Sequence, residues 1–150
     1  MRILFVCTAN IVRSYMAEGI LKGKLDRMQK GDILASSAGL LDMCGASADP
    51  IAVKIMEEEG FPLSGHRSRL LDRSLVEAAD WIIPMEAAHR SLILNDYPDV
   101  GEKLRLLKTF SRDFDGTNCD IKDPYRRSIF LYRLCFSEIY LATDGLLQCI

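Results

Sequence analysis

Three short apolar runs, at residues 3–6, 33–35 and 81–83, and a plausible fourth strand at residues 104–107 alternate along this chain with segments whose apolar residues recur at helical spacing. Continuous apolar runs are typical of strands that are covered on both faces, as in parallel sheets. Because parallel strands need long crossovers, the helical segments supply the connections between them. The sequence therefore predicts an α/β fold, a doubly wound, four-stranded parallel sheet with helices on both faces.

Capping and stop signals delimit the helical segments. The segment after Ser14, a possible cap, repeats apolar residues at helical spacing, and Gly31 stands where that helix would end. Asp49 followed by Pro50 predicts a second helix start, because aspartate accepts hydrogen bonds from free amides and proline fits the first turn. Further helical patterns cover residues 72–79, 85–94 and 131–146.

Length and charge narrow the class of protein. The 150 residues are expected to form one domain, 1–150, without an internal repeat or linker. A net charge of −2 and scattered basic residues argue against a nucleic-acid partner, which requires a basic face to neutralise phosphates. No apolar run approaches the roughly 20 residues that span a bilayer. No membrane association is therefore expected. Five cysteines without ligand-like spacing favour a reduced, cytoplasmic protein with no metal site.

The loop from Cys7 to Ser14 joins the carboxyl end of the first predicted strand to a predicted helix. Parallel sheets bind their ligands outside the carboxyl ends of the strands. Such a loop directs several backbone N–H groups into one concavity, which favours phosphate and also stabilises a thiolate. Arg13 could fold its planar guanidinium over a bound phosphoryl group, and Ser14 Oγ is placed to hydrogen-bond the thiolate. We therefore expect a phosphate-binding loop with Cys7 as nucleophile.

A structural interpretation of the same residues stays open on the pattern alone. A cysteine that ends an apolar strand is more often a small core residue, and Cys-x5-Arg-Ser is short enough to occur by chance. A thiolate that attacks a phosphate ester also needs an acid for the leaving oxygen. Asp123 is a candidate, because Pro124 stiffens its loop and Tyr125 could flank a substrate ring. An Asp-Pro pair is equally a common helix start.

Taken together, these residues resemble the low-molecular-weight protein tyrosine phosphatase family along the whole chain. The matching segments are, in chain order, VCTANIVRS, SSAGL, DPIAVKIMEEEG, GHRSRLL, MEAAHR and DPY. The resemblance implies that Cys7 is the nucleophile, Arg13 the phosphate clamp and Asp123 the general acid. It implies hydrolysis of phosphotyrosine monoesters through a phosphocysteine intermediate, with no metal or other cofactor.

The same resemblance assigns supporting roles around the loop. Asn10 is implied to hold an unusual backbone conformation, which suits asparagine because it tolerates left-handed φ,ψ angles. Ser14, Ser37 and His66 are implied to support it. His89, the other histidine, is expected to be structural or exposed.

Substrate binding is implied for the loop and for the mouth of the site. Met43 and Tyr125 would line the mouth and select the leaving group. The expected partner is a phosphotyrosine-containing protein, with a tyrosine kinase as one candidate, and the loop is expected to bind phosphate-like anions. The remaining implied binding residues are Thr8, Ala9, Asn10, Ile11, Val12 and Ser14.

Two related enzymes of the same fold stay as alternatives. A protein-arginine phosphatase tends to carry threonine where this chain has Ile11, and an apolar side chain there favours an aryl ester over a charged phosphoguanidine. A thiol-dependent arsenate reductase needs two further redox cysteines beyond the middle of the chain, and none lies between Cys44 and Cys119. Val12 also stands where family members commonly have a second loop cysteine.

Overall fold

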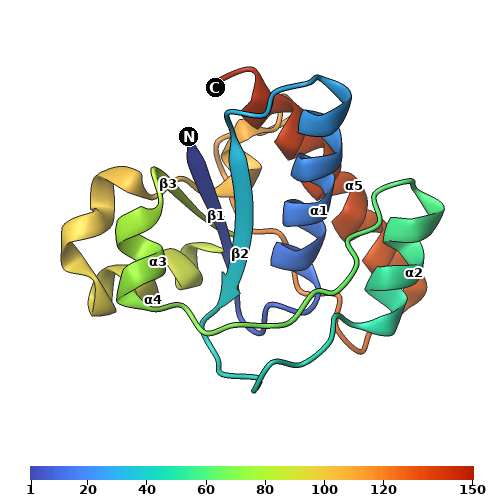
Figure 1. The fold of residues 1–150 in the computed structure, drawn as a ribbon, viewed down its shortest axis with the longest axis horizontal. Coiled ribbons are helices and arrows are strands. Elements are labelled where there is room, and N and C mark those ends of the chain that lie inside the picture. The colour runs from blue at the N-terminus through green and yellow to red at the C-terminus, as the bar shows by residue number, and fades with distance from the viewer.

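The computed structural model describes all 150 residues and is built on a three-stranded parallel sheet with the strand order β2–β1–β3 (Figure 1). The strands are β1 (Arg2–Cys7), β2 (Leu34–Gly39) and β3 (Trp81–Pro84). The central strand β1 is covered on both faces, because its residues Ile3, Leu4, Phe5 and Val6 are at most 2% exposed. The first three predicted strands and their parallel arrangement are thereby confirmed.

The prediction of a fourth strand at residues 104–107 is wrong. Leu104 forms a single isolated bridge with Ile82, and the chain then turns into the short 3₁₀ helix η2 (Leu107–Phe110). Leu104 packs with the cluster on one face of the sheet and Leu107 with the cluster on the other. The segment therefore crosses the sheet edge, and its two buried residues, Leu104 and Leu107, pack without extending the ladder.

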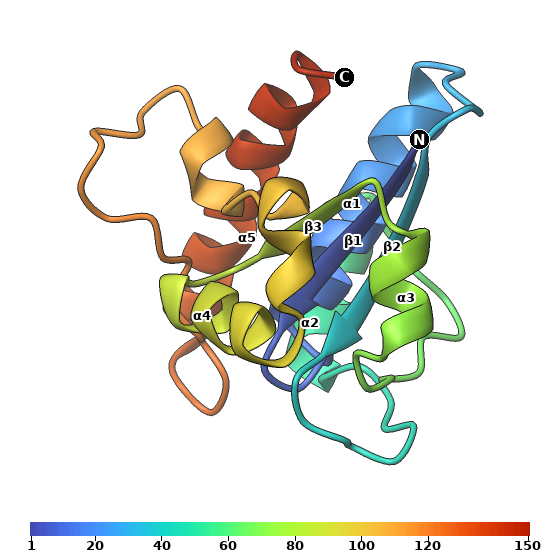
Figure 2. The same cartoon turned by 90° about the vertical axis from the view of Figure 1, so that its left-hand side faces the viewer.

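Helices cover both faces of the sheet, as predicted (Figures 1 and 2). Ile3 and Phe5 face the larger cluster, which is shared with the helices of one side. Leu4 and Val6 face a smaller cluster on the opposite side. No helix is long and apolar enough to span a membrane. The larger cluster involves α1 (Arg13–Arg27), α2 (Pro50–Glu58) and α5 (Ile129–Leu147), and the smaller one α3 (Arg73–Ala78), α4 (Ala87–Asp96) and the 3₁₀ helix η1 (Pro98–Lys103).

The ends of the helices show which capping residues were predicted correctly from the sequence. Asp49 accepts hydrogen bonds from the first amides of α2, and Asp72 caps α3, so the aspartate cap at Asp49 is confirmed and Asp72 plays the same part. Helix α1 differs, because it begins after Val12 without a side-chain cap. Ser14 lies inside α1, and the turn after the helix is made by Gln29, with φ +56°, rather than by Gly31.

Gly145 allows α5 to pack directly on η2, and its replacement tests this contact. A Cβ atom at Gly145 would lie 1.8 Å from the backbone oxygen of Phe110. We expect Gly145→Ala to lower the free energy of unfolding by about 3 kcal/mol, because backbone must move to relieve the clash. Urea denaturation measures the change. Gly31→Ala is the control, since a Cβ there meets nothing within 4 Å, and equal losses in both variants would contradict the assignment.

Candidate active site

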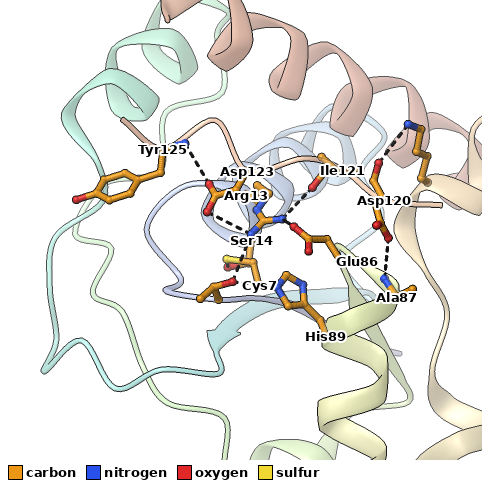
Figure 3. Close-up of polar contacts among 12 residues, drawn as sticks. Cys7, Arg13, Ser14, Glu86, Ala87, His89, Asp120, Ile121, Asp123 and Tyr125 are labelled. Carbon is orange, nitrogen blue, oxygen red and sulfur yellow. Dashed lines mark hydrogen bonds and ion pairs between the residues drawn. The ribbon is translucent and has the colours of Figure 1, made fainter. Parts of the chain in front are cut away.

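The loop between β1 and α1 encloses the Cys7 thiol (Figure 3). Cys7 Sγ lies 3.0 Å from Ser14 Oγ and accepts the N–H of Asn10 at 3.3 Å. The cysteine is only 2% exposed. Because the first amides of α1 lack acceptors within the helix, its N-terminus adds positive potential beside the sulfur. The structure thus places the thiol where a bound anion would meet backbone donors.

Asn10 connects this loop to two other segments of the chain. Its backbone has φ +57° and its side chain is fully buried. Its Nδ2 group donates to Ser14 Oγ and to Ser37 Oγ, both at 2.8 Å, and its Oδ1 accepts the N–H of Arg69 at 3.1 Å. His66 Nε2 donates to the Asn10 carbonyl at 2.7 Å. The structure brings Ser14, Ser37 and His66 into contact with Asn10.

Arg13 is held over the cysteine loop by acceptors from distant parts of the chain. The side chain is 2% exposed, and Nη1 donates to the Ile121 carbonyl at 2.8 Å and to a Glu86 carboxylate oxygen. Nη2 lies 3.5 Å from Asp123 Oδ2. A buried guanidinium needs such partners, because an unpaired charge in the interior is strongly destabilising. Glu86 was not expected from the sequence, although it lies just after β3, at the same sheet edge as Cys7.

Asp123 is not a helix cap, so the structural alternative for this residue does not hold. Helix α5 begins only at Ile129, and Ser128 caps it by accepting the N–H of Leu131. The Asp123 side chain is 45% exposed and its Oδ1 accepts the N–H of Tyr125 at 3.1 Å. This carboxyl group therefore borders Arg13 and remains open to a substrate.

The two residues implied for the mouth of the site are both accessible. Tyr125 is 40% exposed and its ring extends outward from the Asp123 loop (Figure 3), while Met43 is 37% exposed in the segment after β2. Ile11 and Val12 of the cysteine loop are instead buried against the core, with exposed fractions of 8% and 3%. Within the loop, the side chains of Thr8 and Ala9 are the half-exposed ones.

His89 occupies a place that the sequence did not indicate. It lies in the first turn of α4, is 5% exposed, and its Nε2 is 2.9 Å from Thr8 Oγ1. Thr8 Oγ1 in turn lies 3.4 Å from Arg13 Nη2. The available signal was position, because Glu86 and His89 are three residues apart where a helix begins after a strand. His89 is therefore part of the site's surroundings.

Burial, followed by the positive charge of Arg13, lowers the pKa of His89, against the opposing carboxylates of Glu86, Asp123 and Asp120. As the pH falls below about 6.5, the unfolded chain therefore binds a proton at His89 more readily than the folded protein does. The contribution of the neutral His89 to stability, which is present above that pH, is then lost. We expect His89→Gln, which cannot titrate, to show a smaller decrease in melting temperature from about pH 7 to pH 5. Calorimetry at several pH values tests this, and equal decreases in both proteins would contradict it.

Comparison with known proteins gives matches along the entire chain. Residues 2–150 match the family model for low molecular weight phosphotyrosine protein phosphatase. The chain is 33% identical over 147 residues to the protein-arginine-phosphatase of Geobacillus stearothermophilus, covering 98% of this chain and 94% of that protein. It is 33% identical over 138 residues to the low molecular weight protein-tyrosine-phosphatase Wzb of Escherichia coli (strain K12), covering 92% and 84%. The solved low molecular weight protein tyrosine phosphatase from T. tengcongensis matches with a TM-score of 0.92 and 33% identity, covering 100% and 99%.

Proposed function

This chain belongs to the low molecular weight phosphotyrosine protein phosphatase family, and from this we propose that Cys7, Arg13 and Asp123 together hydrolyse phosphotyrosine monoesters. The enzyme class is that of the family, the protein tyrosine phosphatases. The observation that carries the assignment of residues is their convergence. Arg13 lies at the cysteine loop with its Nη2 3.5 Å from the Asp123 carboxylate. A nucleophile, a fixed cation and an accessible acid thus surround one anion site.

In the first step, the Cys7 thiolate attacks phosphorus in line with the ester oxygen. The S–P bond forms as the P–O bond breaks, and Asp123 in its acid form donates a proton to the departing phenolic oxygen. Arg13 and the backbone amides of the loop stabilise the charge on the equatorial oxygens. The products of this step are a phosphocysteine and a neutral tyrosine.

In the second step, water attacks the phosphocysteine from the side that tyrosine has left. Asp123, now a carboxylate, accepts the proton of that water, and the P–S bond breaks to release inorganic phosphate. Ser14 Oγ lies 3.0 Å from the sulfur and can donate a hydrogen bond to the thiolate that leaves. The enzyme returns to its starting form, because Asp123 again carries its proton.

The residues at the mouth of the site support an aryl phosphate as substrate. Ile11 is 8% exposed and packs in the core, so the loop presents no polar side chain at that position to a phosphoguanidine. The exposed Tyr125 and Met43 are available to an aromatic leaving group. The partner we propose is accordingly a phosphotyrosine-containing protein, with a tyrosine kinase as one candidate, in a cytoplasm where the five free cysteines stay reduced.

Matched phosphopeptides test this substrate class. Peptides of one sequence that carry phosphotyrosine, phosphoserine or phosphoarginine at the same position are compared by initial rates of phosphate release. We expect kcat/KM to be highest for phosphotyrosine, by about tenfold or more. Faster turnover of phosphoarginine would instead assign the activity of the Geobacillus stearothermophilus relative to this chain.

A further inference from the structure

A chain of polar contacts leads from α4 to the phosphate clamp. His89 Nε2 lies 2.9 Å from Thr8 Oγ1, and Thr8 Oγ1 lies 3.4 Å from Arg13 Nη2. Thr8 directly follows the nucleophile Cys7, and its side chain is half-buried, so it can reach a bound ligand. The other ring nitrogen, His89 Nδ1, is buried and has no hydrogen-bond partner.

This unpartnered nitrogen decides which tautomer the neutral imidazole adopts. If Nδ1 carried the proton, a buried N–H donor would have no acceptor, and orphaned N–H groups are the rarer kind in folded proteins. If Nε2 carries the proton, Nδ1 presents only a lone pair and Nε2 donates to Thr8 Oγ1. The second arrangement is the less costly one.

The hydroxyl group of Thr8 can then donate its hydrogen bond only to a group other than His89 and Arg13. Arg13 is always a donor, so Thr8 Oγ1 accepts from Arg13 Nη2 as well as from His89 Nε2. With both lone pairs of the oxygen in use, the O–H group must donate to something outside this chain of contacts. Water can accept that hydrogen bond in the free enzyme, because Thr8 is half-exposed.

We propose that His89 is a positioning residue, which donates from Nε2 to Thr8 and thereby directs the Thr8 hydroxyl toward a phosphoryl oxygen held at the cysteine loop. This inference rests on the proposed phosphatase function and adds a side-chain donor to the backbone amides and Arg13. A hydrogen bond to a phosphoryl anion is charge-assisted, and so it is stronger than one between neutral groups. The charged groups around His89 are Arg13 and the carboxylates of Glu86, Asp120 and Asp123, and burial with Arg13 favours the neutral ring.

A double-mutant cycle tests whether His89 acts through Thr8. We expect Thr8→Val and His89→Leu each to lower kcat/KM for an aryl phosphate by about tenfold or more. The double variant should be no slower than Thr8→Val alone, because His89 has nothing left to orient. The inhibition constant of inorganic phosphate should rise in both single variants and should rise no further in the double variant. Losses that multiply in the double variant would overturn the proposal.

Two further measurements do not depend on the stability of His89→Leu. His89→Gln, whose amide nitrogen can replace Nε2, should recover most of the lost rate, whereas the shorter His89→Asn should not. If both recover equally or neither does, His89 is not a donor to Thr8.

Nitrogen NMR of the wild-type protein should show a proton on Nε2 of His89, and a proton on Nδ1 would overturn the proposal. If the wild-type protein shows no turnover, the proposed phosphatase function is refuted. If the wild type is active but Thr8→Val and His89→Leu lower kcat/KM independently of each other, only this inference is refuted.

Discussion

Cys7→Ser is expected to abolish hydrolysis of a phosphotyrosine peptide, with a fall in kcat of about 10⁴-fold or more. A serine hydroxyl has nearly the size of the thiol and can take the same contacts with Ser14 Oγ and the Asn10 amide. It does not ionise at neutral pH, so the attacking anion is lost while the loop keeps its shape. Initial rates of phosphate release measure the effect.

The matched control for this substitution is Cys149→Ser. Cys149 is a free, exposed cysteine that follows α5, and its replacement should leave the rate unchanged. Cys7→Ser should still bind the phosphopeptide, which calorimetric titration can show. Because Arg13 and the loop amides supply the positive charge in this mechanism, EDTA is expected to leave the wild-type rate unchanged. Substantial turnover by Cys7→Ser would remove Cys7 as the nucleophile.

Asp123→Asn is expected to slow the enzyme according to the leaving group of the substrate. The tyrosine phenol has a pKa near 10 and departs poorly without a proton, so kcat/KM should fall by about 10²- to 10⁴-fold. An acidic phenol such as nitrophenol departs readily as an anion, and its phosphate ester should be much less affected. A plot of log kcat/KM against leaving-group pKa for a series of aryl phosphates should therefore be steeper for the variant.

Asp120→Asn provides the comparison within the same loop. Asp120 Oδ1 accepts the N–H of Ala87 at 2.8 Å, and asparagine keeps that acceptor. This variant should retain the wild-type slope and nearly the wild-type rate. Parallel slopes for Asp123→Asn and the wild type would show that another group protonates the leaving oxygen.

Local patterns accounted for most of the fold. The apolar residues 3–6 form the central strand, and Asp49 caps α2, because each of these features depends on neighbouring residues. The prediction of a strand at residues 104–107 was wrong, because burial alone does not specify a strand. Leu104 and Leu107 are both buried, but they pack against opposite faces of the sheet. Only tertiary structure separates such an edge-crossing segment from a fourth strand.

Some residues of the candidate site could be predicted from the sequence, and others could not. Cys7 and Arg13 lie at the two ends of one loop, and they were predicted as site residues from the place of that loop between a strand and a helix, together with the family resemblance. Glu86 and His89 reach that loop across 73 and 81 residues of sequence, through the pairing of β1 with β3. Glu86 precedes α4 and His89 lies in its first turn, where neither residue type is unusual. Their position after a strand was therefore the one signal in their own segment, and it did not show that they contact the cysteine loop.

Asn10 makes the loop from Cys7 to Ser14 part of the globular core. Its buried amide joins Ser14 of α1, Ser37 of β2 and the backbone of Arg69, so the loop cannot open without separating three parts of the molecule. Turnover can then serve as a reporter of folding. In denaturant, the activity and the fluorescence of Trp81, the single tryptophan, should be lost along one common curve.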